Sequence, residues 1–211
     1  MPEPAFDPET LLAALHREGV RFVLIGGMAA VLHGDVGVTV DVDIAPAADA
    51  DNLRRLAAAL RGLDARVRAE GSPDGLAFDC SPEFFENVGP GAILNLTTRA
   101  GALDIAFVPA GTAGYRDLKR DAVSLETSPG VFVLVASLAD VIRSKSAADR
   151  EKDRQALPRL YDLLAEAAAR REAGDRGSDA RHSEKMLGAF DSGIPDLAED
   201  HDRYLAEDFD D

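Results

Sequence analysis

Two aspartates separated by one residue, Asp41 and Asp43, are the side chains whose type and spacing point most directly to chemistry. Residues 38–44 alternate between apolar and polar side chains, which is the pattern of a strand with two different faces. Two carboxylates on one face lie side by side, and burying both charges without a partner is costly. A divalent cation with oxygen ligands neutralises both, so the pair predicts a metal site. Alternation alone also fits the solvent-facing side of an edge strand.

The same alternation assigns the neighbouring side chains to the two faces of this strand. Thr39 shares the face of the aspartates, whereas Val40, Val42 and Ile44 lie on the other face. We therefore expect one strand that begins at residue 38 and is ended by Pro46.

A strand, a tight turn and a short helix are predicted directly before the aspartates. Residues 22–25 form an apolar run of β type, Gly26 and Gly27 follow, and residues 28–32 are good helix formers. Paired glycines have no Cβ and let the backbone approach a ligand, and the N–H groups that begin a helix attract anions such as phosphate. Without the aspartates, the two glycines indicate only a turn.

Asp104 offers a third carboxylate, because it stands between two apolar residues in a run of β type. Residues 92–97 and 102–108 are separated by a short polar segment, a spacing typical of a hairpin. If the second of these strands neighbours the strand of the first two aspartates, Asp104 completes an acidic site. A lone aspartate in a strand otherwise simply faces water.

Caps, breakers and periodicity predict most of the other elements. Asp7 and Asp49 are predicted N-caps of helices. Helices are expected over residues 7–19, 49–62, 112–120, 137–145 and 151–171, and strands over residues 123–126 and 131–135. Pro158 is expected to kink or restart the last helix. Val67 and residues 76–78 are candidates for short strands. Because residues 71–75 are typical of a turn and residues 81–91 have no clear period, the bounds of elements in this region are left open.

Composition excludes several classes of protein. The chain has 211 residues, 46% of them hydrophobic, and a formal net charge of −15. Its single cysteine, Cys80, excludes an internal disulfide and a cysteine-rich zinc site. No apolar run is long enough to span a bilayer and the N-terminus does not resemble a signal peptide, so we expect a cytoplasmic protein with no membrane contact. The negative charge disfavours broad, non-specific nucleic-acid binding but permits a local basic groove.

In combination, these motifs resemble those of minimal nucleotidyltransferases of the DNA polymerase β superfamily. Among these, the chain resembles the AbiEii-like, MenT-like toxin nucleotidyltransferases of type IV toxin–antitoxin systems. The resemblance covers about the first three-quarters of the chain. It rests on Gly26-Gly27, on residues 39–44, on residues 103–105, and on residues 140–145 followed by 150–153.

The resemblance implies a fold and a set of site residues. The fold is an α/β (α+β) polymerase β-like core, a mixed β-sheet flanked by helices, with C-terminal helices and an acidic tail. The implied roles are metal binding by Asp41, Asp43 and Asp104, nucleotide binding by Gly26, Gly27 and Thr39, and phosphate contact by Lys145 and Arg150. A solvated helix face remains the alternative interpretation of Lys145 and Arg150.

The implied activity is Mg²⁺-dependent transfer of a nucleoside monophosphate from an NTP to a hydroxyl acceptor, with two Mg²⁺ ions and release of pyrophosphate. Enzymes of the toxin type imply a tRNA 3′ end as acceptor and a cognate antitoxin protein as partner. Related enzymes that modify protein hydroxyls or aminoglycosides leave other acceptors open. A catalytically silent binding module with the same fold is the rival from a different class. The chain has Val38 where such enzymes often carry a basic residue, which puts one substrate contact in question.

Three segments are expected along the chain: a nucleotidyltransferase core over residues 1–136, a helical segment over 137–172, and a flexible acidic extension over 173–211. The extension holds 4 lysines and arginines against 12 acidic residues, more than half of the net negative charge. We interpret it as a solubilising tail; autoinhibition and antitoxin docking are the alternatives.

Overall fold

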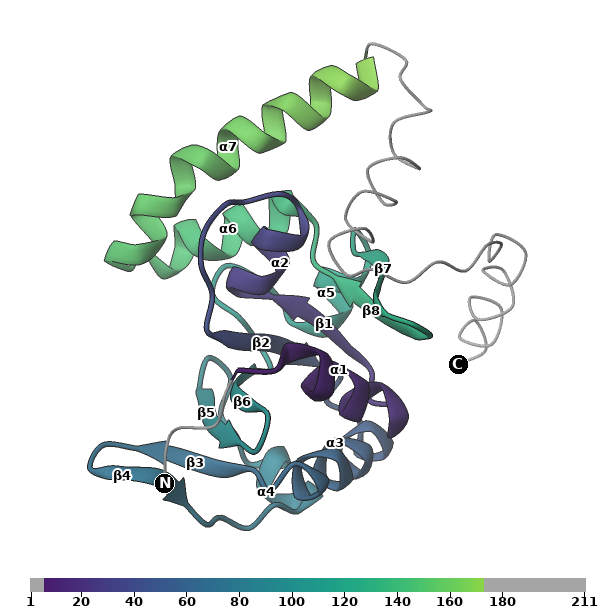
Figure 1. The fold of residues 1–211 in the computed structure, drawn as a ribbon, viewed down its shortest axis with the longest axis vertical. Coiled ribbons are helices and arrows are strands. Elements are labelled where there is room, and N and C mark those ends of the chain that lie inside the picture. Colours follow the sequence, from purple (N-terminus) through teal and green to yellow (C-terminus); the bar gives the residue numbers. More distant parts are fainter. Residues whose placement is uncertain (1–5, 173–211) are drawn as a thin grey trace.

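The computed structural model describes residues 6–172, which form one eight-stranded mixed sheet flanked by helices (Figure 1). This confirms the predicted α/β class. The strands are β1 (Phe22–Ile25), β2 (Asp41–Pro46), β3 (Arg66–Ala69), β4 (Ser72–Leu76), β5 (Ile93–Thr98), β6 (Gly101–Ala106), β7 (Val123–Ser128) and β8 (Val131–Val135). Their order across the sheet is β4-β3-β5-β6-β2-β1-β8-β7.

Helices cover the sheet, and two of them begin at the predicted N-caps Asp7 and Asp49. Each of these side chains accepts a hydrogen bond from the backbone N–H three residues ahead, and Ser137 caps α6 in the same way. The helices of the described chain are α1 (Pro8–Arg17), α2 (Gly26–Leu32), α3 (Ala50–Gly62), α4 (Pro82–Glu86), α5 (Tyr115–Lys119), α6 (Leu138–Ala148) and α7 (Glu151–Glu172). In Figure 1, α2, α6 and α7 are stacked above β1, with α3 at the lower end of the molecule.

The core lies where β1, β2 and β6 meet the helices. β2 pairs antiparallel with β1 and parallel with β6, so it is an interior strand. Its apolar face carries Val42 and Ile44, both fully buried, and they belong to the same core cluster as the leucines of α1 and α3. Burial of this apolar surface is the main stabilising contribution to the sheet. It also holds the opposite, acidic face of β2 in a defined position.

The strand that carries the aspartates begins later than predicted. β2 starts at Asp41 rather than at residue 38, and Val38 and Val40 are 93% and 68% exposed. The pairing explains this, because β6 meets β2 only from Asp41 onward and β1 meets it only from Asp43. Without a neighbouring strand, an alternating sequence has no sheet to join and no face to bury.

The region left unassigned contains a hairpin and a short helix. β3 and β4 pair antiparallel around a turn at Gly71, and β3 joins the main sheet through β5. α4 follows, with Ser81 as its N-cap and Pro82 as its first residue. These capping residues are readable in the sequence, but a helix of this length has no apolar period to support them.

The last described helix continues through Pro158 instead of restarting there. Pro158 has no backbone N–H for the carbonyl of Arg154, four residues earlier, but Arg154 is exposed, so water can satisfy that carbonyl. Within residues 6–172, no helix combines the length and apolarity needed to cross a bilayer. The acidic extension over residues 173–211 lies outside the described residues.

Candidate functional site

The three predicted aspartates meet on one face of the sheet. Asp41 and Asp43 lie on β2, and the parallel register places Asp43 opposite Asp104 on β6. One carboxylate oxygen from each residue lies within 4.8 Å of the others. All three side chains are partly buried. The fold therefore brings together, from two strands distant in sequence, an oxygen-donor set of the kind that Mg²⁺ prefers.

Gly26 is required by the approach of Asp43. A Cβ built on Gly26 would lie 2.0 Å from Asp43 Oδ2, and the φ of Gly26 is +68°. A side chain at this position would collide with the carboxylate and would also strain the backbone. The neighbouring Gly27 donates its backbone N–H to Asp43. The glycine pair thus positions a site carboxylate, a role distinct from the predicted contact with nucleotide.

Ionisation of the acidic cluster is unfavourable in the folded protein. Burial and then the negative charges of Asp41 and Asp104 raise the pKa of Asp43 from 3.8 to about 6. Burial also raises the pKa of Asp104, although the cation of Arg68 opposes this shift. Both shifts mean that the folded protein disfavours the charged carboxylates. A cation placed among them would reverse this preference.

Thr39 lies just outside β2 and contacts the cluster directly. Its hydroxyl donates to Asp41 Oδ1 at 2.9 Å, and Thr39 Oγ1 would lie 2.8 Å from a Cβ built on Gly27. The structure therefore places Thr39 between the first aspartate and the glycine turn. This geometry orients Asp41; the predicted role in nucleotide binding stays a prediction.

Asp104 has two further partners that the sequence did not reveal. Arg68 on β3 forms an ion pair with Asp104 Oδ1. Asn95 on β5 stands opposite Asp104, and with its amide nitrogen turned toward the carboxylate it donates to Oδ2 at 3.0 Å. The polar alternation of β5 hinted at an exposed face, but only the register across β3, β5 and β6 identifies these contacts.

Lys145 and Arg150, the predicted phosphate cations, both bind one buried aspartate. Lys145 Nζ lies 3.2 Å from Asp153 Oδ1, and Arg150 Nε lies 2.8 Å from Asp153 Oδ2. Asp153 is fully buried and Lys145 nearly so, whereas the Arg150 side chain is 54% exposed. These contacts connect α6 to α7 and commit the Lys145 charge to a structural partner.

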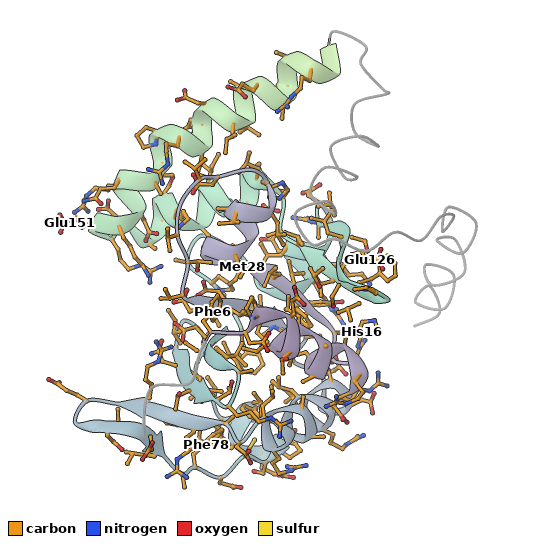
Figure 2. All side chains as sticks on the ribbon, viewed as in Figure 1. Phe6, His16, Met28, Phe78, Glu126 and Glu151 are labelled. Atoms are coloured by element: carbon orange, nitrogen blue, oxygen red, sulfur yellow. The ribbon has the colours of Figure 1, made fainter. Side chains whose placement is uncertain are left out.

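Lys152, at the start of α7, is a cation near the cluster that was missing from the predicted site residues. Its positive charge lowers the pKa of both Asp43 and Asp104, and Arg150 adds a smaller effect on Asp104. Lys152 is exposed, so its ammonium group is available to an anion bound beside the aspartates. Figure 2 labels the adjoining Glu151, which marks the end of α7 that carries Lys152.

The loop between α2 and β2 carries Val38, at the position where the resemblance leads us to expect a basic residue. Val38 is exposed, but a cation reaches this loop from α7, where Arg159 Nε lies 3.1 Å from Asp35 Oδ1. The Asp35 side chain is only 7% exposed. Arg159 therefore ties the outer helix to the loop that leads into Asp41.

Comparisons with known proteins identify no family. No protein-family model matches the chain, and no curated protein matches it. Among solved structures, the fold is similar to that of the lincosamide antibiotic adenylyltransferase LnuA bound to lincomycin, with a TM-score of 0.47 and 16% sequence identity. The alignment covers 73% of this chain and 94% of that one. At this level of similarity, the neighbour establishes neither the family nor the activity of this chain.

Proposed function

We propose that this chain is an Mg²⁺-dependent nucleotidyltransferase that transfers a nucleoside monophosphate from an NTP to a hydroxyl acceptor. The observation that carries the proposal is the convergence of Asp41, Asp43 and Asp104 within 4.8 Å, beside the Gly26-Gly27 turn. A structural cluster of three mutually repelling carboxylates would be costly to maintain without a cation. Function explains why the fold retains it.

The donor set fits a divalent metal. Three carboxylates supply only oxygen ligands, and Mg²⁺ in proteins is bound by a few carboxylates together with substrate phosphates and water. Burial raises the pKa values of Asp43 and Asp104 even though nearby cations lower them, so a bound metal ion would stabilise the charged form of both carboxylates. We propose two ions here, because paired metals would supply charge neutralisation at both the attacking and the leaving oxygen of a phosphoryl displacement.

We assign each of the other roles in the transfer reaction to a protein residue by its position. The acceptor hydroxyl oxygen forms a bond to the α-phosphorus, the bond between that phosphorus and the bridging oxygen breaks, and pyrophosphate leaves. Asp104, on the outer side of the cluster, takes the proton of the attacking hydroxyl. Lys152 binds the triphosphate, because it is exposed and its charge acts on Asp43 and Asp104, while Lys145 is paired with Asp153. Thr39 and Gly27 hold Asp41 and Asp43 in place.

We extend the proposal to an RNA acceptor, with a tRNA 3′ end favoured, and to a role as the toxin component of a toxin–antitoxin pair in the cytoplasm. The support for this extension is the resemblance of the motifs at residues 26–27, 39–44, 103–105 and 140–153. An antitoxin protein is the expected partner. Modification of protein hydroxyls or of a small molecule is the competing choice of acceptor.

The test is transfer of label from each of the four NTPs, radiolabelled at the α-phosphate, to total cellular RNA or protein in the presence of Mg²⁺. Asp43→Asn keeps the size of the side chain and removes a carboxylate ligand, so we expect at least about a hundredfold loss of transfer. Asp51→Asn, at an exposed position of α3 that pairs with Arg54, removes the same charge outside the cluster and serves as the matched control. The labelled product identifies both the nucleotide and the acceptor class.

A silent binding module predicts a different outcome. Wild-type protein would transfer no label from any NTP to RNA, protein or small hydroxyl compounds, and Asp43→Asn would bind its partner as well as wild type. That result would remove the proposed activity. Equal transfer of label by wild type and Asp43→Asn would instead contradict the proposed role of Asp43 in metal binding.

A further inference from the structure

A row of polar side chains crosses the sheet from the acidic cluster to the β3 strand. The β2–β6 register pairs Asp43 with Asp104, and the β5–β6 register pairs Asp104 with Asn95. The β3–β5 register pairs Val67 with Leu96, so its continuation places Arg68 opposite Asn95. All four side chains of this row therefore lie on one face of the sheet. The last residue of the row, Arg68, extends across Asn95 and forms an ion pair with Asp104.

The face beyond Asp104 is open. On β5, Leu96 faces the core and is fully buried, whereas Ile93, on the same side as Asn95, is 49% exposed. Arg68, Ala69, Glu70 and Asn95 line a shallow open depression of about 340 Å³ on this surface. The Arg68 side chain is 42% exposed and the Asp104 side chain 15% exposed. The guanidinium therefore has room to leave Asp104 and turn toward a ligand in the depression.

We propose that Arg68 exchanges partners during the reaction: it holds Asp104 in the metal-free protein and, once metal binds that carboxylate, binds a backbone phosphate of an RNA acceptor beside the reacting 3′-hydroxyl. This inference rests on the proposed nucleotidyltransferase function and assigns its acceptor side to the β3–β5 face. Arg68 is then a specificity-determining residue that favours an acceptor carrying phosphate.

The chemistry of the two partners supports an exchange. A metal at Asp104 competes with the Arg68 cation for the same carboxylate oxygens, and the displaced guanidinium needs a new anion. Guanidinium groups bind phosphate through paired hydrogen bonds, as they bind carboxylates. Asn95 donates to Asp104 from the neighbouring strand, so the carboxylate keeps one orienting contact when Arg68 departs. A phosphate bound by Arg68 would bring the end of the acceptor strand next to Asp104.

The first arm of the test measures Mn²⁺ binding to the full chain by calorimetry, with no nucleotide or acceptor present. Arg68→Gln removes the competing cation, so we expect Mn²⁺ to bind about threefold more tightly, the size expected for a partly exposed ion pair. Arg54→Gln removes the same charge from α3, where Arg54 pairs with Asp51, and should leave Mn²⁺ affinity unchanged. In the Asp104→Asn background, Arg68→Gln should lose its effect, because the two residues act through one contact.

The second arm measures binding of a short 5′-labelled single-stranded RNA by fluorescence anisotropy in Mn²⁺, without NTP. Arg68→Gln should weaken binding about fivefold and should lower the slope of log Kd against log salt by about 0.7, the loss of one phosphate contact to a single strand. The Arg54→Gln variant should match wild type in both respects. A nucleoside without phosphate should not distinguish wild type from Arg68→Gln.

The outcomes separate this inference from the proposed function. Tighter Mn²⁺ binding together with weaker, less salt-dependent RNA binding supports the exchange even if no transfer is detected with any NTP. Unchanged or weaker Mn²⁺ binding by Arg68→Gln overturns it, and so does RNA binding equal to that of Arg54→Gln. If the enzyme transfers label but gives either of these two overturning results, the proposed nucleotidyltransferase activity stands and the acceptor binds away from Arg68.

Discussion

At the scale of single residues, the acidic cluster is held together by local geometry that acts against its electrostatics. Asp43 is partly buried beside two other carboxylates, and Gly26 leaves the space into which its carboxylate fits. The clustered negative charge costs stability in the metal-free protein and favours a bound cation, whereas Gly26 relieves a steric clash. Functional sites commonly retain such local strain. Each feature can be measured by itself.

The Asp43 carboxylate makes the metal-free protein less stable as pH rises. Its pKa of about 6 in the folded state, against 3.8 ordinarily, means that the folded protein binds a proton that the unfolded chain releases between these values. The stabilisation is complete below pH 3.8 and is lost as pH rises through about 6, by about 3 kcal/mol for the full shift. In EDTA, Asp43→Asn should therefore gain stability relative to wild type between pH 4 and pH 7. Urea unfolding of both proteins at several pH values checks this. If the free energy of unfolding changed with pH equally in wild type and Asp43→Asn, the prediction would be wrong.

Gly26→Ala should damage both the fold and the site. The added Cβ would meet Asp43 Oδ2 at 2.0 Å, and alanine disfavours the positive φ of this position. We expect a loss of about 1–3 kcal/mol in the free energy of unfolding and weaker Mn²⁺ binding. Gly62→Ala, where nothing lies within 4 Å of the added Cβ and the position is helical, is the matched control and should be neutral or stabilising. Equal effects of the two substitutions on Mn²⁺ affinity would refute the role of Gly26.

At the scale of elements, the contact between α6 and α7 depends on a buried ion pair. Asp153 at the start of α7 binds Lys145 of α6, and Arg150 binds the same carboxylate. Burial by itself raises the pKa of Asp153, but the hydrogen bonds from Arg150 and Lys145 outweigh burial and lower it. This pair fixes the first turn of α7, which carries Lys152, the cation whose charge lowers the pKa of Asp43 and Asp104.

Asp153→Asn should therefore loosen this junction. The substitution leaves the Lys145 ammonium nearly buried without a counter-charge, and we expect a loss of about 3 kcal/mol in stability at pH 7. Because the pKa of Asp153 is lowered in the folded state, its stabilisation is present above the unfolded pKa and disappears as pH falls through the folded one. The gap between variant and wild type should narrow in acid. Asp162→Asn, on the exposed side of α7, should change stability by less than about 0.5 kcal/mol.

At the scale of the whole molecule, charge is unevenly distributed along the chain. Residues 173–211 carry 12 acidic residues against 4 basic ones, which is more than half of the net charge of −15. If the chain binds RNA as proposed, this negative charge slows association and weakens affinity at low salt. The acidic extension is therefore expected to modulate RNA binding.

A chain that ends at residue 172 should unfold in urea with a free energy within about 0.5 kcal/mol of that of the full chain. It should also bind single-stranded RNA more tightly at low salt, and the difference should disappear as salt screens the lost charges. Both measurements use the same purified pair of proteins. A large loss of stability would contradict the first expectation. RNA binding equal to that of the full chain would show that the extension does not affect RNA binding.

The sequence alone determined the features that depend on neighbouring residues. The caps at Asp7 and Asp49, the strand before Gly26 and the hairpin that carries Asp104 all arise from side-chain types a few positions apart. They were predicted because turns, caps and alternation act over that range. The early start of the aspartate strand was wrong for the complementary reason: alternation continues to residue 38, but pairing partners end at Asp41.

Only the tertiary structure decided which side chains meet. Asp104 reaches Asp43 through the parallel pairing of β2 with β6, and Arg68 reaches Asp104 through the register of three strands. Lys145 is likewise bound by Asp153 because α6 and α7 pack together. Such contacts join residues far apart in the chain, and no local pattern encodes the register that creates them. The candidate carboxylates could therefore be read from the sequence, whereas the cations that surround them required the fold.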